Sequence, residues 1–282
     1  MSKPKRPSPE PVRPASGRIE SALLRARDEG RVALIAYLTA GYPEPDATPG
    51  LVRALVEGGA DAVELGIPFS DPLADGVTIQ RSSFQALQHG VTAARVLQMV
   101  KDLRGGGVVI PLIVMTYYNP ILAYGLDGFA KDAAAAGVDG LIPVDVPPEE
   151  ADELVARCQE HGLDFIPLLA PTSTDERIAL AVEQASGFLY CVSVAGVTGA
   201  REALPRELGA FLERVRRQTE LPLAVGFGIS RWEHVEALRG KADAAIVGSA
   251  IIEVIEAAPR DEREVRVKEY VEVLTGRRKA RV

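Results

Sequence analysis

A carboxylate inside an apolar run is the feature of this sequence that most directly suggests chemistry. Glu64 stands in AVELG, residues 62–66, where all the other residues are apolar or glycine. A strand that is apolar on both faces is a buried strand, so a charge there is costly unless it is paired or neutralised. No Lys or Arg lies close to Glu64 in the sequence. We interpret Glu64 as a proton-transfer group, although an ion pair with a distant Arg would also explain it.

Two more acids follow in a loop that prolines stiffen. Asp71 and Asp75 come after Pro68 and close to Pro72. Asp-Pro and Asp-Gly pairs are ordinary turn chemistry, which is the simpler explanation of either acid alone. Acids that gather over the end of a buried strand are nevertheless typical of a pocket in which protons are transferred.

The composition excludes several classes of function. The 282 residues are 47% hydrophobic and 25% charged, as in an ordinary globular protein. The formal net charge of −7 argues against nucleic acid or an anionic membrane as a partner. The cysteines and histidines predict neither a disulfide framework nor a metal site, because they are few and scattered: Cys158, Cys191, His89, His161 and His234.

The first 17 residues differ from the rest. The run MSKPKRPSPEPVRPASG is rich in proline and basic residues and lacks the apolar core of a signal peptide. Nothing in it favours burial, so we predict a disordered tail over 1–17 and a single folded domain over 18–282. No apolar stretch approaches the roughly 18 residues of a membrane span. The sequence therefore predicts a cytoplasmic protein.

Eight short β-rich runs alternate with helical, charge-bearing segments. The runs begin at Val32, Ala62, Pro111, Gly140, Phe165, Phe188, Leu223 and Ala244. Strand alternating with helix predicts right-handed βαβ units and a parallel sheet. Eight such units in one domain match an α/β fold of the (β/α)8 TIM barrel type. The turn after the first run lacks the GxGxxG that a doubly wound dinucleotide-binding sheet would carry.

The active site of such a barrel lies at the carboxyl ends of its strands. Alternation along the strand places Glu64 on the inner face, pointing into the barrel mouth. Five more side chains are expected to line this mouth and to favour an apolar or aromatic group on the substrate, although core packing would explain each alone. They are Tyr37, Met115, Tyr117, Ile142 and Tyr190.

Glycine-bearing loops follow the last three runs. They are AGVTGAR (195–201), GFGIS (226–230) and GSA (248–250). Loops after the last two strands of a barrel, together with a helix N-terminus, commonly bind phosphate through backbone N–H groups. Ser249 is expected to cap a helix that starts near Ile251. Tight turns would explain any single loop, but the two loops together favour a phosphorylated substrate.

The motifs ELGIPFSDPLADGVTIQ, MTYYNP, VDVPPEE, GVTGAR, GFGIS and VGSAI together resemble the tryptophan synthase alpha chain family, in family order from about Arg18 to about Leu274. The resemblance implies a metal-independent carbon–carbon lyase that cleaves indole-3-glycerol phosphate into indole and glyceraldehyde 3-phosphate. It also implies no cofactor in this chain. The expected partner is a beta chain that uses pyridoxal phosphate to join indole to serine, in an alpha2beta2 heterotetramer.

The resemblance also implies residue roles. Glu64 would transfer protons, Asp75 would bind the indole nitrogen, and Tyr190 would stand at the catalytic centre. The phosphate site would comprise Gly199, Gly226, Phe227, Gly228, Gly248 and Ser249. Thr198 matches the threonine of a mobile loop that closes on substrate. Pro68, Asp71 and Asn119 match positions that face the beta chain. Two departures concern loops: Val77 replaces a proline after LADG, and Ala195 replaces a hydroxyl residue before GVTG.

Three other functions are alternatives to this one. Another phosphate-binding barrel enzyme, such as a phosphosugar isomerase or aldolase, would carry a catalytic Lys or His on a strand, and none of the runs has one. A non-catalytic subunit that only activates a partner would be expected to lack Glu64 or Asp75. A stand-alone lyase that releases free indole stays open, although the partner-facing residues argue for a complex.

Overall fold

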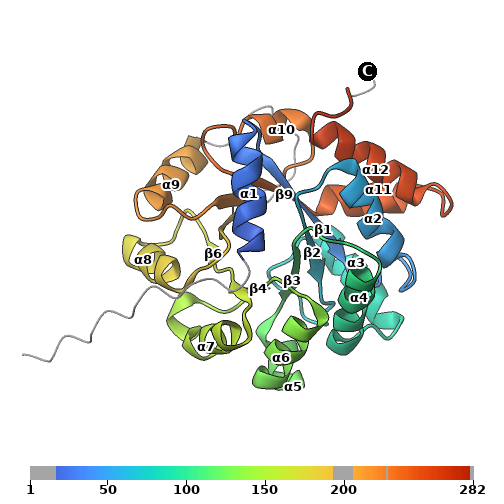
Figure 1. The fold of residues 1–282 in the computed structure, drawn as a ribbon, viewed down its shortest axis with the longest axis horizontal. Helices are drawn as coiled ribbons and strands as arrows, with labels where there is room; N and C mark the ends of the chain where they lie inside the picture. The colour runs from blue at the N-terminus through green and yellow to red at the C-terminus, as the bar shows by residue number, and fades with distance from the viewer. Residues whose placement is uncertain (1–16, 193–205, 227, 280–282) are drawn as a thin grey trace, which may run out of the picture.

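The computed structural model describes residues 17–192, 206–226 and 228–279, which form a ring of parallel strands surrounded by helices (Figure 1). The strand order around the ring is β5-β4-β3-β2-β1-β9-β8-β7-β6. The strands are β1 Ala33–Thr39, β2 Ala62–Gly66, β3 Leu112–Thr116, β4 Gly140–Pro143, β5 Asp164–Phe165, β6 Leu168–Leu169, β7 Leu189–Val192, β8 Leu223–Gly226 and β9 Ala244–Val247.

The ring closes through one interrupted strand. β5 pairs with β4, whereas β6, two residues further on, pairs with β7. Between them stands Pro167, which cannot donate to a ladder, while its carbonyl accepts from the amide of Tyr190 at 3.2 Å. The two short strands are thus the halves of the fifth run that the sequence predicts. The predicted TIM barrel is confirmed, with that strand in two pieces.

Apart from the first helix, helices cover the outside of the ring, and they lie between successive strands along the chain except between β5 and β6 (Figure 1). None of the helices in the described part of the chain combines the length and the hydropathy that a membrane crossing requires. The helices are α1 Arg18–Asp28, α2 Thr48–Gly58, α3 Val77–Gln88, α4 Ala93–Gly105, α5 Tyr118–Tyr124, α6 Leu126–Ala136, the 3-10 helix η1 Pro148–Glu150, α7 Asp152–His161, α8 Asp175–Gln184, α9 Arg206–Arg216, α10 Trp232–Glu236, α11 Ser249–Ala257 and α12 Arg263–Leu274.

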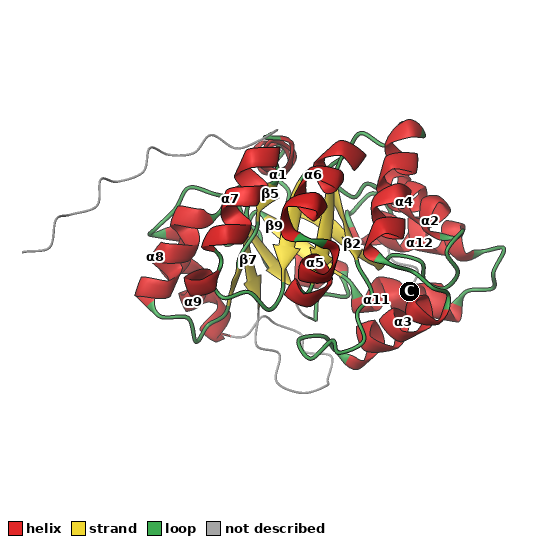
Figure 2. Cartoon of the chain, turned by 90° about the horizontal axis from the view of Figure 1, so that it is seen from below, coloured by secondary structure: helices red, strands yellow, loops and turns green. Residues whose placement is uncertain are grey.

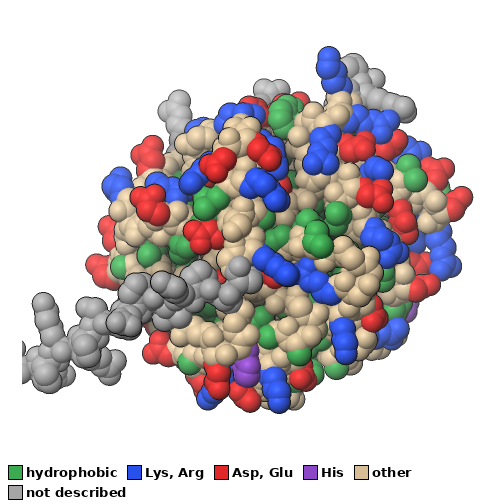
Figure 3. All heavy atoms as spheres, in the orientation of Figure 1, with side chains coloured by type: hydrophobic (Ala, Val, Ile, Leu, Met, Phe, Trp, Pro, Cys, Tyr) green, Lys and Arg blue, Asp and Glu red, His purple; other side chains and the backbone are tan. Residues whose placement is uncertain are grey.

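Alternation along the strands separates two apolar layers. One fills the interior of the ring and contains residues such as Ile35, Ile113 and Ala224. The other lies between the strands and the outer helices. Helix α1 closes the interior layer at the end where the strands begin, because Ile19 and Leu23 belong to that layer (Figure 2). On the face that α1 crosses, acidic and basic side chains are interspersed (Figure 3).

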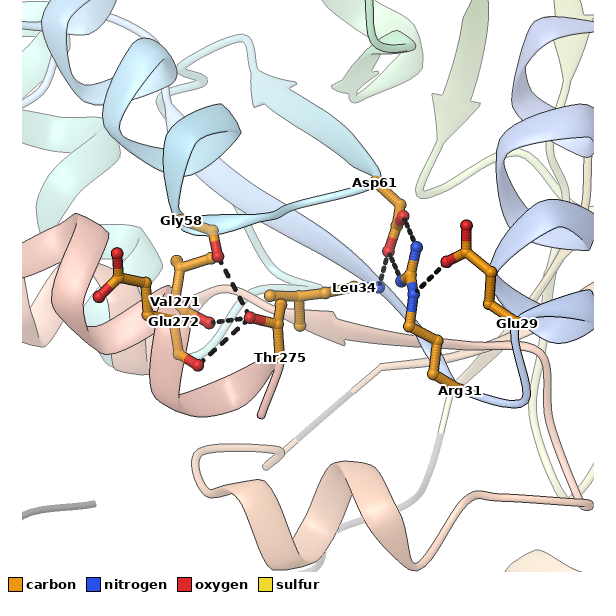
Figure 4. A network of polar contacts seen from close by, with 8 residues as sticks. All are labelled: Glu29, Arg31, Leu34, Gly58, Asp61, Val271, Glu272 and Thr275. Carbon is orange, nitrogen blue, oxygen red and sulfur yellow. Dashed lines mark hydrogen bonds and ion pairs between the residues drawn. The ribbon is translucent and has the colours of Figure 1, made fainter. Parts of the chain in front are cut away.

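Three buried aspartates, each directly before a strand, hold the strand starts together. Each accepts a backbone N–H from the first or second residue of the neighbouring strand, at 2.8 or 2.9 Å, and pairs with an arginine. Figure 4 shows the first of these strand-start Asp–Arg pairs. The sets are Asp61 with Leu34 and Arg31, Asp139 with Leu112 and Arg104, and Asp243 with Leu223 and Arg216. These stabilising pairs lie at the amino ends of the strands, away from the carboxyl ends at which the sequence predicts the active site.

Candidate active site

Glu64 lies on the inner face of β2 and is 0% exposed. The strand register sets it beside Tyr37 of β1 and Ile113 of β3. Neither carboxyl oxygen has a hydrogen-bond partner among the described residues, so the alternative of a buried ion pair finds no support there. Burial raises the pKa of Glu64 to about 8. The side chain is therefore mostly protonated at neutral pH and holds a proton that it can donate.

Asp75 lies in the loop between β2 and α3 and is anchored by Tyr117, the residue directly after β3. The Tyr117 hydroxyl donates to Asp75 Oδ2 at 3.1 Å and accepts the amide hydrogen of Ala74 at 3.0 Å. The Tyr117 ring also packs on Phe69, with 5.0 Å between the ring centroids. Burial raises the pKa of Asp75 to about 6, and the hydrogen bond from Tyr117 opposes that rise. Asp75 is thus mostly a carboxylate at neutral pH.

Two tyrosines complete this cluster of polar groups. Tyr37 and Tyr190 are 6% and 8% exposed, and burial raises the pKa of both phenols. Glu64 and Asp75 push both pKa values further in the same direction. The four groups therefore share one electrostatic neighbourhood, in which the phenols stay neutral and can donate hydrogen bonds.

Glycines at the strand ends leave room for these tyrosine rings. A Cβ atom on Gly226 would lie 2.3 Å from the hydroxyl oxygen of Tyr190. On Gly66 it would lie 2.2 Å from the hydroxyl oxygen of Tyr37, and on Gly248 it would lie 3.2 Å from the same ring. Gly66 and Gly226 therefore make room for the two tyrosines, and Gly248 lies close to one of them, in addition to the phosphate role that the sequence predicts for Gly226 and Gly248.

The two glycine loops at β8 and β9 lie at the carboxyl ends of the strands. Gly228 is exposed and has a φ of +77°, a conformation that favours glycine. Gly248, not Ser249, caps α11: its carbonyl accepts from the amides of Ile251 and Ile252 at 2.9 and 3.1 Å. The predicted Ser249 cap is therefore wrong, because β9 ends at Val247 and the helix begins at once. Thr198, Gly199 and Phe227, together with Ala195, lie outside the described residues.

Almost the whole chain matches one known family. The model of the tryptophan synthase alpha chain family matches residues 23–281. The chain is 54% identical to the tryptophan synthase alpha chain of Roseiflexus castenholzii over 92% of its own length and 99% of that relative. The chain belongs to the tryptophan synthase alpha chain family. This confirms the predicted family and, with it, the carbon–carbon lyase class.

Solved structures of the family share the fold. Tryptophan synthase subunit alpha from Legionella pneumophila is 40% identical, with a TM-score of 0.85 over 92% of this chain and 97% of that one. Tryptophan synthase from M. tuberculosis, in an aminoacrylate-bound form, is 36% identical, with a TM-score of 0.82 over 92% and 98% of the two chains. Membership of this family leaves the alternative of a phosphosugar isomerase or aldolase without support.

The remaining residues predicted for the pocket lie on the same inner wall as Glu64. The register aligns Met115 with Gly66 on one side and with Ile142 on the other. Ile142 is buried, and Met115 is half-buried. Together with Tyr37 and Tyr190 they surround the carboxyl of Glu64 with apolar and aromatic surface, as an indole ring would require.

The positions predicted to face a beta chain fall into two groups. Asp71 and Asn119 are exposed, whereas Pro68 is buried, so Pro68 shapes the loop rather than a contact surface. Sequence reasoning missed Leu73 and Phe84, whose side chains are 92% and 63% exposed in this loop and in α3. Large apolar side chains in a polar segment are the signal that would have found them.

One group of side chains could hold a metal ion in the described part of the tryptophan synthase alpha fold. Asp127, Glu160 and His161 bring three ligand atoms within 4.8 Å of one another, on the outer helices α6 and α7. Arg157 already pairs with both carboxylates, at 3.8 and 2.6 Å. The cluster is therefore an ion-paired surface group remote from the strand ends that carry Glu64.

Proposed function

We propose that Glu64 and Asp75 carry out the reaction of the family in this chain. The reaction cleaves indole-3-glycerol phosphate into indole and glyceraldehyde 3-phosphate. The observation that carries the assignment is the buried carboxyl of Glu64 on the inner wall of the barrel mouth, which has no hydrogen-bond partner among the described residues. Burial raises its pKa to about 8, which keeps it mostly protonated at neutral pH. A group of this kind is suited to donate one proton and then accept another.

The first step is protonation of the indole ring. Glu64 gives its proton to carbon 3 of the indole, which turns the ring into an electron sink for the bond to be broken. The indole nitrogen becomes positively charged, and its N–H faces a carboxylate that stays ionised. Asp75 suits that position, because its pKa of about 6 leaves it charged at neutral pH.

The second step is the retro-aldol cleavage itself. The carbon–carbon bond between the ring and the glycerol chain breaks, and its electron pair returns to the indole. The adjacent hydroxyl becomes the aldehyde and loses its proton to the Glu64 carboxylate, directly or through water. Glu64 ends the cycle protonated, as it began, and the substrate is divided without gain or loss of atoms.

The phosphate end of the substrate is assigned to the loops after β8 and β9. Support comes from the exposed, positive-φ Gly228 and from Gly248 at the start of α11. Backbone N–H groups and the positive end of the helix dipole favour a phosphate there. Gly199 and Phe227, which lie outside the described residues, belong to the same proposal.

We infer that a beta chain takes up the indole. The exposed Asp71, Asn119 and Leu73 near the barrel mouth support a contact surface beside the site. In the family the partner is expected to carry pyridoxal phosphate, and an alpha2beta2 assembly belongs to this proposal. A chain that works alone and releases free indole is the alternative.

The experiment is turnover by Glu64→Gln, with Glu57→Gln as a matched control. Glu57 is an exposed carboxyl on α2 that pairs with Lys268. We expect Glu64→Gln to lose at least 100-fold in turnover, since general acid–base groups contribute about 10²–10⁴-fold. Binding of glycerol 3-phosphate should not change in either variant. Retention of more than a few per cent of turnover by Glu64→Gln would disprove the assignment.

A further inference from the structure

The backbone after β8 is held from outside the ring by the last helix. The hydroxyl of Tyr270, on α12, donates to the carbonyl oxygen of Ser230 at 2.7 Å. The amide of Ser230 donates to Nδ1 of His234 at 3.3 Å. Ser230 closes the GFGIS run, so the end of this loop is fixed through both of its backbone groups.

Helix α12, which carries Tyr270, is itself held in place by close packing against α2. It packs against α2 so closely that a Cβ atom on Gly58 would lie 2.7 Å from Val271. The hydroxyl of Thr275 donates to the carbonyl oxygen of Gly58 at 3.1 Å (Figure 4). In the ring, β9 lies between β1 and β8, and α2 follows β1. Tyr270 therefore links the loop after β8, on one side of β9, to a helix pair that is anchored on the other side.

The Tyr270 ring packs against the core on one side and borders an open cavity on another. The half-buried ring forms one wall of a cavity of about 230 Å³ between α11 and α12, together with Val254 and Val273. The hydrogen bond to Ser230 holds the hydroxyl end of the ring, beyond what its packing on the core provides. Burial raises the pKa of the phenol, which therefore stays a donor through the working range of pH.

We propose that Tyr270 is a positioning residue for the phosphate group of the substrate. By holding the carbonyl of Ser230, it fixes the backbone that follows β8 in the conformation that receives a phosphomonoester. This inference rests on the proposed function, which places the phosphate at the loops after β8 and β9. Tyr270 touches no reacting atom, so its removal changes phosphate binding and leaves the proton transfers intact.

The chain contains its own reporter for this loop. Trp232 is the only tryptophan, two residues after Ser230. Its ring lies against the end of α12, where a Cβ atom on Gly276 would be 3.0 Å from it. Titration of glycerol 3-phosphate against the fluorescence of Trp232 therefore measures binding next to the contact in question.

The test is Tyr270→Phe, which removes only the hydroxyl. We expect the Kd for glycerol 3-phosphate and the KM for indole-3-glycerol phosphate both to rise about 3- to 10-fold, the range for one lost hydrogen bond. The turnover number at saturation should stay within twofold of the wild type, because the lost interaction binds the phosphate equally in the substrate and in the transition state. Binding of indole, which has no phosphate, should not change.

Tyr124→Phe is the matched control, because the Tyr124 hydroxyl donates to the exposed Asp132 at 2.7 Å, away from the glycine loops. It should match the wild type in every measurement. A Kd for glycerol 3-phosphate within twofold of the wild type in Tyr270→Phe would overturn the inference. Equal weakening of indole and glycerol 3-phosphate would do the same, since it marks a general loss of structure. A wild-type chain that neither binds glycerol 3-phosphate nor cleaves the substrate would instead overturn the proposed function.

Discussion

The hydroxyl of Tyr117 donates to Oδ2 of Asp75 at 3.1 Å, across 42 positions of sequence. The same oxygen accepts the amide hydrogen of Ala74. One phenol at the end of β3 therefore both positions the loop after β2 and keeps its acid ionised. The loop contact and the charge of Asp75 are coupled through this single group.

Tyr117→Phe should move the acid limb of the pH profile upward. The hydrogen bond from Tyr117 lowers the pKa of Asp75 against the effect of burial, so its loss raises that pKa above the present value of about 6. Activity that needs the Asp75 carboxylate should then fall off at a higher pH. The measurement is kcat/KM from pH 5 to pH 9. An unchanged acid limb would show that Asp75 does not control it.

The wild-type profile should be bell-shaped. Asp75 must be ionised, which requires a pH above about 6, and Glu64 must begin protonated, which requires a pH below about 8. Glu64→Asp keeps an acid in the site and should retain a bell with a displaced alkaline limb. A rate that continues to rise beyond pH 9 would contradict the role of Glu64 as the initial proton donor.

Glu64→Gln should stabilise the fold at alkaline pH. The folded-state pKa of this acid is raised from 4.5 to about 8, so the wild type loses stability progressively as the pH rises between those values. The loss is complete above about 8 and is on the order of a few kcal/mol. Urea unfolding at pH 5 and pH 9 measures it, and the advantage of Glu64→Gln should appear mainly at pH 9.

Asp164 provides a contrast within the same experiment. It is fully buried, and its carboxyl oxygens make no hydrogen bond of good geometry in the described residues. Burial raises its pKa from 3.8 to about 6, and the nearby hydroxyl of Ser186 opposes that rise. The free energy of unfolding of the wild type therefore falls, on account of Asp164, as the pH rises from about 3.8 to about 6. Asp164→Asn should already show its full gain at pH 7. A gain that grows further from pH 7 to pH 9 would contradict this assignment.

Gly226→Ala should destabilise the barrel by about 1–3 kcal/mol, the usual cost of overpacking. The added methyl group would lie 2.3 Å from the hydroxyl oxygen of Tyr190 and 2.6 Å from its ring. Tyr190→Phe in the same chain should recover part of the loss. Gly209→Ala in α9 is the control, because nothing lies within 4 Å of the added atom. It should raise the melting temperature slightly, as removal of a helical glycine does.

Activation by a beta chain should depend on the exposed loop after β2. Asp71→Ala and Leu73→Asp should each reduce the rise in turnover of indole-3-glycerol phosphate across a titration of beta chain, while the basal rate stays. Both side chains are exposed, and Leu73 offers apolar surface to a partner. A rate that stays flat through saturation, with binding shown separately, would mean that this chain works alone.

Local pattern was enough to predict the elements that carry the site. The strand 62–66 and the inward direction of Glu64 follow from apolar patterning and the two-residue period, and β2 has these bounds. The division of the fifth strand follows from Pro167, whose effect depends on which neighbour each half meets. The Ser249 cap was wrong because a propensity cannot tell a serine cap from a glycine carbonyl that starts the helix directly.

Contacts between distant segments could not be predicted. Tyr270 and Ser230 stand 40 positions apart, and Tyr117 and Asp75 stand 42 apart. Which side chains meet depends on the tilt of strands and the packing of helices, and a single sequence contains no record of either. The same holds for the tyrosines that explain Gly66 and Gly226, because a glycine in isolation suggests a turn as readily as a close approach.

The strand-start Asp–Arg pairs have a consequence for redesign. They register β1 with β2, β3 with β4, and β8 with β9 at the end of the ring that takes no part in the proposed chemistry. Exchange of the segment 67–76, or of the turn after β9, would leave all three pairs in place. The loops at the carboxyl ends of the strands can therefore be exchanged without disturbing the contacts that stabilise the strand starts. A new substrate preference can be selected by loop grafting on the same stable barrel.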